Sequence, residues 1–161
     1  MQIYLLRHGT AEDCRLGLRD ADRALIPEGN EKLLRVLRRA RAAGVHPGVI
    51  LSSPYRRAVE TAQAAAEALR YSGKIVETAA LTPDASPAEA WEEVRTRRDE
   101  SAVLLASHEP LMSSMAAFLL DTPTLVVDMK KAALVRIDCE RMDRSPSGVL
   151  KWMLTPSVAG D

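Results

Sequence analysis

The sequence alternates between short apolar runs and stretches with helical spacing. Residues 3–6, 49–51 and 102–106 are apolar runs rich in residues that favour strands, and each run ends at polar residues. Runs without an alternating polar face predict strands that are covered on both faces of a sheet. Because a helical pattern follows each run, we predict an α/β fold, a three-layer α/β/α sandwich with a mostly parallel central sheet.

Helical spacing and start signals locate the helices. Residues 27–43 place Pro27 in the first turn and an apolar stripe on one side, and residues 56–71 carry an alanine-rich face. Ser86 and Glu89 have the spacing of a capping box at the start of a further helix. The other predicted elements are a loop over 11–26, strands over 74–78, 132–138 and 149–155, a helix over 110–120 and a loose tail over 156–161.

Length and composition fit one compact domain over residues 1–161. A chain of this size buries about 70% of the surface that its unfolded form exposes. Hydrophobic residues make up 47% of the sequence, so a substantial core is expected. The 22 basic and 22 acidic side chains balance, which argues against a general attraction to nucleic acid or to an acidic membrane surface.

Cysteine usage and hydropathy favour a cytoplasmic protein. Cys14 and Cys139 are far apart and lack metal-ligand spacing, which favours reduced thiols, with an extracytoplasmic bridge as the alternative. No apolar stretch has the length of a membrane span, and the chain enters a strand within two residues, which leaves no room for a signal peptide. We expect no metal and no cofactor.

Side chains with a common chemistry follow the three apolar runs. Arg7, His8 and Gly9 follow the first run, Arg57 comes shortly after the second, and His108 follows the third. The carboxyl ends of parallel strands lie at one edge of a sheet, where ligands bind in open α/β folds. Two arginines and two histidines around one crevice suit a dianionic phosphoryl group, so the sequence predicts a phosphate site at this edge.

Three ordered segments, LLRHGTAED, LSSPYRRAVETA and ASHEPLM, resemble the histidine phosphatase superfamily, the phosphoglycerate-mutase-like proteins. The likeness runs from residue 2 to about residue 155. The small size and the spacing of the segments resemble the SixA-type phosphohistidine phosphatases of that superfamily. The resemblance implies the phosphoglycerate-mutase-like fold and phosphatase activity.

In this interpretation His8 attacks phosphorus and becomes a covalent phosphohistidine, which water then hydrolyses. The attack needs an uncharged ring nitrogen, and two flanking guanidinium groups oppose protonation of the ring. Arg7 and Arg57 hold the equatorial phosphoryl oxygens and stabilise the transition state without a metal ion. His108 donates to the phosphate or helps a proton reach the leaving group, with a helix-capping histidine as the structural alternative.

Three further assignments follow from position. Arg57, not Arg56, stands four residues before Thr61, as the pocket arginine does in the family's Arg-Ala-x-x-Thr signature, so Arg56 is expected on the surface. SixA-type proteins carry an arginine in a similar position before their first helix, so Arg23 is a candidate third phosphate ligand, with a solvated arginine as the alternative. Gly9 is expected to let the backbone turn tightly beneath the phosphate, with a plain strand terminator as the alternative.

The general acid of many superfamily esterases and mutases is missing. They place a carboxylate in the loop after the third strand, whereas residues 79–83 contain no acid before Asp84. Imidazole needs less protonation to leave than an alkoxide, so we predict hydrolysis of phosphohistidine on a protein partner of the phosphorelay or phosphotransferase type. The alternatives are a small-molecule phosphomonoesterase that uses Asp84 or His108 as acid, and a phosphoprotein-binding module without turnover. The intact set of pocket side chains argues against the module.

The helix over 27–43 has a basic outer side that the phosphate site does not explain. Its members are Lys32, Arg35, Arg38, Arg39 and Arg41. A solvated face is the usual meaning of such a pattern, and a docking surface is the alternative.

Overall fold

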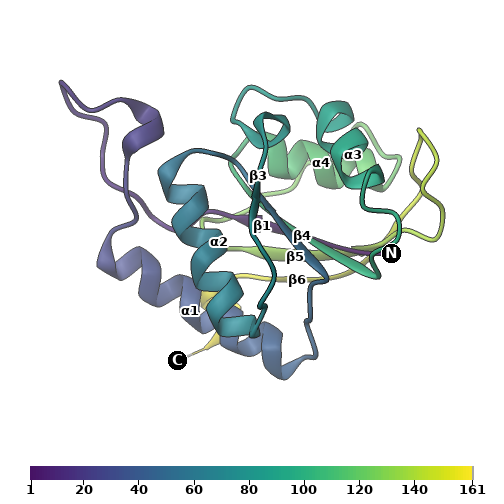
Figure 1. The fold of residues 1–161 in the computed structure, drawn as a ribbon, viewed down its shortest axis with the longest axis horizontal. Coiled ribbons are helices and arrows are strands. Elements are labelled where there is room, and N and C mark those ends of the chain that lie inside the picture. The colour runs from purple at the N-terminus through teal and green to yellow at the C-terminus, as the bar shows by residue number, and fades with distance from the viewer. Residues whose placement is uncertain (161) are drawn as a thin grey trace.

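The structure is a computed structural model that describes residues 1–160. Its strands are β1 (Gln2–Arg7), β2 (Val49–Ser52), β3 (Val76–Glu77), β4 (Ala102–Ser107), β5 (Leu134–Asp138) and β6 (Val149–Leu154). They form one sheet in the order β3-β2-β4-β1-β5-β6 (Figure 1). β4 pairs in parallel with β1 and β2, and β2 pairs in parallel with β3, whereas β5 runs antiparallel to β1 and β6. The predicted mostly parallel sheet is therefore confirmed.

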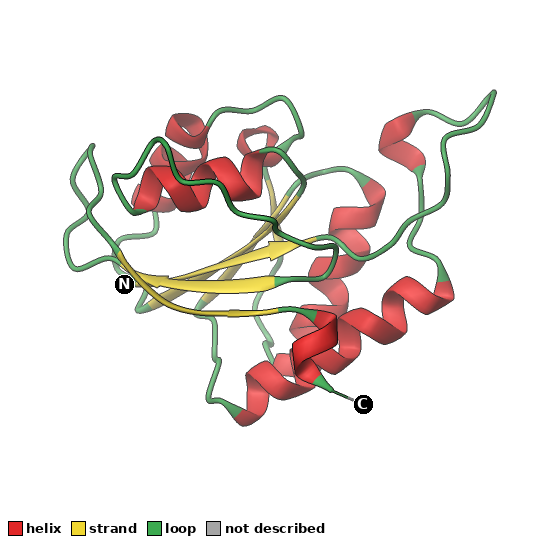
Figure 2. Ribbon diagram, turned by 180° about the vertical axis from the view of Figure 1, so that it is seen from behind, coloured by secondary structure: helices red, strands yellow, loops and turns green. Residues whose placement is uncertain are grey.

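Helices cover both faces of the sheet. The helices are α1 (Pro27–Ala42), α2 (Arg56–Leu69), α3 (Pro87–Arg95), α4 (Leu111–Leu119) and α5 (Pro156–Ala159), with short 3-10 turns η1 (Asp20–Asp22) and η2 (Ala79–Leu81). α1, α2 and α5 lie on one side of the sheet, and α3 and α4 lie on the other (Figure 2). These layers confirm the predicted α/β/α sandwich.

The central strands show why the apolar runs have no polar face. In β1, Ile3 and Leu5 pack into the core beneath α3 and α4, and Tyr4 and Leu6 pack into the core beneath α1 and α2. All four side chains are fully buried. Burial of such a side chain contributes roughly 1.5–3 kcal/mol, so substitution of any of the four by a polar residue would weaken the layer that supports the end of β1.

Local signals set the helix boundaries close to their predicted positions. The capping box at α3 is present, since Ser86 N–H donates to Glu89 at 2.8 Å and Glu89 N–H donates to the Ser86 hydroxyl at 3.3 Å. α2 ends two residues before its predicted end because Arg70 adopts a left-handed conformation with φ 57°. The strand predicted over 74–78 is shortened to Val76–Glu77, which pairs only with β2 at the sheet edge.

The prediction of a loose tail over 156–161 is wrong for its first four residues, and Asp161 lies outside the described residues. Pro156–Ala159 forms α5, in which the N–H groups of Val158 and Ala159 both donate to the Thr155 carbonyl. α5 packs against α1, and Ala159 contacts the core on that side of the sheet. Four residues are too few to display a helical period, so the sequence pattern could not reveal this docking.

The cysteines are free thiols, Cys14 on the surface and Cys139 in the core. Burial raises the pKa of the Cys139 thiol to about 11, so it stays protonated. Within residues 1–160, no helix combines the length and the apolarity that a membrane span requires.

Candidate active site

The side chains that follow β1, β2 and β4 meet at one edge of the sheet. The rings of His8 and His108 lie 5.0 Å apart between centroids, and Nε of Arg57 lies 3.3 Å from Nε2 of His8. Arg7 ends β1 and pairs in register with Ser107, directly before His108. The loop that leaves this edge after β1 extends away from the sheet and returns to α1 (Figure 1). Three segments far apart in the sequence thus build one cluster.

Backbone hydrogen bonds and one ring contact fix His8. Its N–H donates to the Ser107 carbonyl at 2.9 Å, and its own carbonyl accepts from Ala132 N–H at 3.1 Å. Nδ1 of the ring lies 2.7 Å from the Gly9 carbonyl oxygen. A carbonyl can only accept, so we assign the proton of the neutral ring to Nδ1. The lone pair is then on Nε2, the nitrogen that faces Arg57.

The surroundings keep His8 uncharged. Burial is the largest cause and lowers the pKa of His8 to about 4, although the hydrogen bond to Gly9 opposes the shift. The positive charges of Arg57, Arg7 and Lys131 lower the pKa further. The arginines therefore act in the direction that the sequence predicts, but burial contributes more than they do.

Arg7 is held at the end of β1 by its backbone and by one carbonyl. Its N–H donates to the Ala133 carbonyl, and Nη1 donates to the Met129 carbonyl at 2.6 Å. Nε of Arg7 is buried without a hydrogen-bond partner among the described residues. A buried donor without a partner is costly, so this N–H is well suited to bind an anion.

Arg57 occupies the first turn of α2 and is 5% exposed. Nη1 donates to the Asp20 carbonyl oxygen at 2.6 Å, and Nη2 donates to the Asp20 carboxylate at 3.0 Å. Arg56 is exposed and pairs with Glu60 at 2.9 Å. The structure therefore directs Arg57 inward and Arg56 outward, as the register of the signature predicts.

Arg23 is connected to this cluster through Asp20. Its Nε donates to the Glu12 carbonyl, and its Nη1 donates to the Asp20 carboxylate at 2.7 Å. The two arginines thus share one carboxylate, and both lower the pKa of Asp20, although its partial burial opposes them as the largest single effect. Direct contact of Arg23 with a phosphate stays a prediction.

The reason for glycine at position 9 is packing, not an unusual backbone conformation. The φ of Gly9 lies outside the left-handed region, so its backbone conformation alone does not require glycine, and its place beneath a phosphate stays a prediction. A Cβ at Gly9 would lie 3.0 Å from the Gly29 carbonyl oxygen, where α1 crosses the end of β1. Gly9 N–H donates to the Thr61 hydroxyl at 3.3 Å, and that hydroxyl donates to the Arg57 carbonyl at 2.6 Å. Thr61 thereby ties the Gly9 backbone to the turn that carries Arg57.

His108 is also buried and neutral. Burial is the largest cause that lowers its pKa to about 3, and the charges of His8 and Arg57 act in the same direction. Nε2 lies 2.8 Å from the Ser53 hydroxyl, and the Tyr55 ring packs edge-on against the imidazole at 5.2 Å. Nδ1 is buried without a partner among the described residues. This nitrogen is the free hydrogen-bonding atom of the ring.

Asp84, the carboxylate that the sequence offers as a possible acid, is not among the acidic groups that interact with the cluster. Asp84 is exposed in the loop after β3, and that loop is fixed to β4 by a hydrogen bond from the Ser107 hydroxyl to the Leu81 carbonyl at 2.7 Å. Burial lowers the pKa of Arg7, and the charge of Glu109 opposes this shift. Asp20 pairs with Arg57, and Glu109 and Asp128 act on Arg7, so these three carboxylates influence the cluster. Within residues 1–160, no three His, Cys, Asp or Glu side chains are arranged to hold a metal ion.

Sequence reasoning missed two residues of this site. Ser53 lies in the polar cluster after β2, so the rule that located Arg57 could also have located it. Asp20 reaches Arg57 from a loop without periodicity, 37 residues earlier in the chain, and only the fold brings them together. No spacing signal pointed to that contact.

Comparison with known proteins agrees with this geometry. Residues 3–82 match the sequence model of the histidine phosphatase superfamily, branch 1. An uncharacterized protein of Picosynechococcus sp. is 30% identical over 138 residues, which span 84% of this chain and 83% of that protein. The chain belongs to the histidine phosphatase superfamily.

Solved structures with the same fold include members with different substrates. The protein histidine phosphatase SixA, in complex with tungstate, is 23% identical and matches over 98% of both chains with a TM-score of 0.84. A phosphoserine phosphatase variant from Entamoeba histolytica, in complex with phosphoserine, is 15% identical and matches over 98% of both chains with a TM-score of 0.73. These likenesses show the phosphoglycerate-mutase-like fold, and a fold shared by two such proteins does not select the substrate.

Proposed function

We propose that this histidine phosphatase superfamily protein hydrolyses phosphohistidine on a protein. The observation that carries the proposal is the tautomer of His8. Nδ1 donates to the Gly9 carbonyl, so Nε2 carries the lone pair, which accepts a hydrogen bond from Nε of Arg57 at 3.3 Å until a phosphoryl group takes the place of that donor. A neutral imidazole at the end of a parallel strand, with guanidinium groups beside it, has the form of a nucleophile for a phosphoryl group.

The proposed reaction has two displacements at phosphorus. In the first, the Nε2 lone pair of His8 forms a bond to phosphorus while the bond from phosphorus to the substrate imidazole breaks. The substrate imidazole leaves with the bonding electrons, and it leaves as a neutral ring when its other nitrogen is protonated, so that the phosphorylated ring is a cation before the bond breaks. In the second, water attacks phosphorus, the bond to Nε2 breaks, and inorganic phosphate leaves as dihydrogen phosphate with both protons of the water.

Arg57, Arg7 and His108 have distinct tasks in this proposal. Arg57 donates to the phosphoryl oxygens after they replace the Asp20 carboxylate at Nη2, where the present bond is 3.0 Å. Within this cluster, Nε of Arg7 and Nδ1 of His108 are buried nitrogens without partners among the described residues, and both are proposed to bind phosphoryl oxygens. Fixed charges and dipoles aimed at the transferring group stabilise the transition state without reorganisation.

The carboxylates around the site support imidazole as the leaving group. Asp84 is exposed, and the pKa of Asp20 is lowered, so Asp20 holds no proton at neutral pH. An alcohol would leave as an alkoxide without such a proton, whereas imidazole leaves neutral. The lack of a proton donor therefore favours phosphohistidine over an alkyl phosphate as the substrate. We propose that a phosphorylated protein partner carries this phosphohistidine.

A small-molecule phosphomonoesterase is the second candidate, because of Glu109. Its charge influences Arg7, and its Oε1 accepts from Ser113 N–H at 2.9 Å, which places a carboxylate at the rim of the cluster. The phosphoserine phosphatase with the same fold is consistent with ester hydrolysis on this scaffold. Glu109 would then have to supply the missing proton.

Initial rates on three substrates separate the candidates. A phosphohistidine protein, p-nitrophenyl phosphate and a sugar phosphate are each offered to the wild type and to His8→Ala. We expect the fastest turnover on phosphohistidine, an acid-labile and alkali-stable phosphoenzyme in rapidly quenched samples, and no turnover in the variant. The proposal fails if the sugar phosphate is the best substrate. A phosphoenzyme that still forms in His8→Ala would remove the proposed mechanism.

A further inference from the structure

A cluster of basic side chains lies in a cavity beside the candidate active site. The cavity has a volume of about 700 Å³ and lies between the start of α1, the segment before β5 and α5. Five basic side chains line it: Arg7, Lys32, Arg35, Lys130 and Lys131. None of the described residues that line it is acidic. A volume of this size is in the range of ligand sites.

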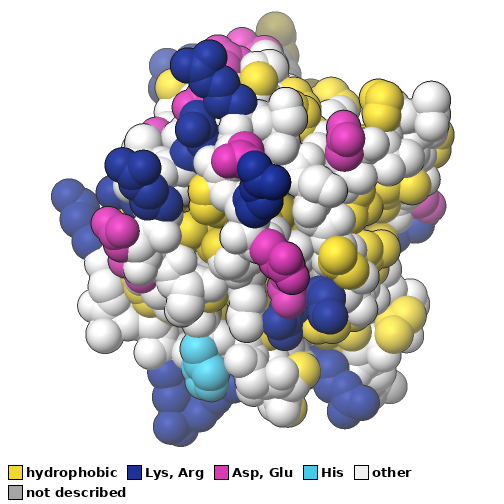
Figure 3. All heavy atoms as spheres, turned by 90° about the vertical axis from the view of Figure 1, so that its right-hand side faces the viewer, with side chains coloured by type: hydrophobic (Ala, Val, Ile, Leu, Met, Phe, Trp, Pro, Cys, Tyr) yellow, Lys and Arg dark blue, Asp and Glu magenta, His cyan; other side chains and the backbone are white. Residues whose placement is uncertain are grey.

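The positive charge around the cavity is a local feature, because the chain as a whole has no net charge. The formal net charge of the sequence is zero. The face at the opposite end of the sheet, near Met1, carries scattered basic and acidic side chains among apolar and uncharged ones (Figure 3). Five cations around one concavity raise the local concentration of anions there.

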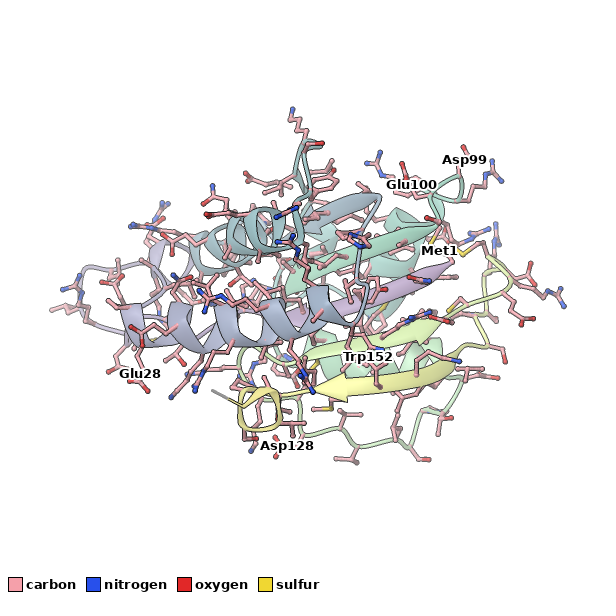
Figure 4. All side chains as sticks on the ribbon, turned by 90° about the horizontal axis from the view of Figure 1, so that it is seen from below. Met1, Glu28, Asp99, Glu100, Asp128 and Trp152 are labelled. Atoms are coloured by element: carbon pink, nitrogen blue, oxygen red, sulfur yellow. The ribbon has the colours of Figure 1, made fainter. Side chains whose placement is uncertain are left out.

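The carboxylates that pair with two of the lysines in the cavity wall are exposed. Lys32 pairs with Glu28 on α1, and Lys130 pairs with Asp128 at 2.6 Å, and both carboxylates are labelled in Figure 4. The side chains of Glu28 and Asp128 are 67% and 75% exposed. Exposed pairs of this kind contribute little stability, so the lysines can turn to a bound anion at low cost. Lys131 is exposed and needs no such exchange.

The cavity shares Arg7 with the phosphoryl site. Arg7 lines the cavity, and its charge also acts on His8. Lys131 lines the cavity as well, and its charge lowers the pKa of His8, so both basic residues act on the nucleophile from the cavity side. An anion in the cavity would therefore belong to the molecule whose phosphoryl group lies on His8.

We propose that this cavity binds acidic side chains that flank the phosphohistidine of the protein substrate. The inference rests on the proposed function and adds the recognition of the partner. Carboxylates suit ammonium and guanidinium donors, and the hydroxyls of Thr155 and Ser157, which line the far wall, supply further donors. Because α5 forms part of that wall, its packing against α1 helps to shape the cavity.

Synthetic phosphohistidine peptides of equal length test this inference. Three peptides carry glutamate, glutamine or lysine on both sides of the phosphohistidine, and kcat/KM is measured for each. We expect the glutamate peptide to exceed the glutamine peptide by about three- to tenfold, as a few exposed ion pairs allow. The lysine peptide should be poorest, and added salt should narrow the differences.

Paired variants of α1 locate the effect. Lys32→Gln combined with Arg35→Gln removes two charges from the cavity wall, and Arg38→Gln combined with Arg39→Gln removes two charges from elsewhere on the same helix. The first pair should abolish the preference for glutamate over glutamine through KM, and the second pair should retain that preference. Lys130→Gln, on another wall, should act like the first pair even if the α1 variant folds poorly.

The outcomes separate the two proposals. Equal kcat/KM for the three peptides, or an undiminished preference in both cavity variants, would overturn the inference and leave the proposed function intact. Turnover of p-nitrophenyl phosphate with no hydrolysis of any peptide would instead overturn the proposed function.

Discussion

The carboxylate of Asp20 accepts a hydrogen bond from Nη2 of Arg57 at 3.0 Å, while its carbonyl oxygen accepts from Nη1 at 2.6 Å. The guanidinium that faces His8 is thus already paired with an anion. A bound phosphoryl dianion would have to share Arg57 with this carboxylate or displace it. The carbonyl oxygen can keep Arg57 in place when the carboxylate leaves.

The first prediction concerns this competition. Asp20→Asn should tighten the inhibition by orthovanadate, a tetrahedral oxyanion, by about fivefold, because two like charges about 4 Å apart repel by about 1 kcal/mol in water. The inhibition constant measured at neutral pH checks this expectation. Asp22→Asn, a change in the same 3-10 turn at a residue that pairs with Arg19, should have no effect. Weaker inhibition of Asp20→Asn would show that the carboxylate mainly positions Arg57.

The neighbouring arginines give the second prediction. Arg57→Gln should lower kcat/KM by about 10²–10³, the usual cost of losing one charged donor to a transition state. Arg56→Gln should stay within about twofold, since it removes only an exposed pair with Glu60. Steady-state kinetics of both variants on the same substrate measures the two losses, and the melting temperature of each variant checks its folding. Equal losses would contradict the inward and outward assignment of the two side chains.

The extent to which the sequence predicts the site depends on how local the signal is. His8, Arg57 and His108 directly follow strands or begin helices, so a rule about strand ends finds them. Asp20 lies in an aperiodic loop that leads into α1. Its contact with Arg57 depends on how that loop passes α2. The contact of Gly9 with Gly29 likewise depends on how α1 crosses β1. Such contacts exist only in the assembled fold, and neither composition nor period encodes them.

The third prediction is the pH dependence of activity. With the pKa of His8 near 4 and that of His108 near 3, both rings are neutral above about pH 5. On the acid side, the kcat/KM should show no loss from protonation of His8 until about pH 5 and should fall as His8 takes up a proton below that. Lys131→Gln should move this fall to higher pH, since its charge lowers the pKa of His8. A fall centred near pH 6.5 would mean that His8 is not shielded from protonation.

The fourth prediction is the pH dependence of stability. In the unfolded chain both histidines take up a proton near pH 6.5, whereas in the folded protein they stay neutral until about pH 4 and pH 3. The unfolded state binds more protons between these values, so the free energy of unfolding should decrease as the pH falls from about 6.5 towards 4. Urea unfolding at several pH values measures this slope. His8→Asn should reduce the slope, and a slope that is unchanged in His8→Asn would contradict the assignment.

The last prediction concerns the leaving group and distinguishes phosphohistidine from esters. Imidazole that leaves as a neutral ring has a conjugate acid with a pKa of about 6.5, whereas an alkoxide resembles hydroxide, for which water has about 15.7. Without a positioned acid, the rate should therefore decrease from phosphohistidine to aryl phosphate to alkyl phosphate. The second-order rate constants of the three substrates, measured with one enzyme preparation, test this order.

Variants of the nearby carboxylates show whether a hidden acid changes that order. Asp84→Asn should alter phosphohistidine hydrolysis by less than about twofold, because Asp84 is exposed and away from the described cluster contacts. Glu109→Gln keeps an oxygen for Ser113 N–H but removes the ionisable carboxyl group and its charge near Arg7, so it should affect phosphohistidine hydrolysis far less than alkyl phosphate hydrolysis if Glu109 is an acid. If Glu109→Gln removed activity on alkyl phosphate alone, Glu109 would be the proton donor of an esterase. Cleavage of alkyl phosphate as fast as phosphohistidine in the wild type would then make the phosphomonoesterase the better account, since only a working general acid could offset a difference in leaving-group basicity of about nine units.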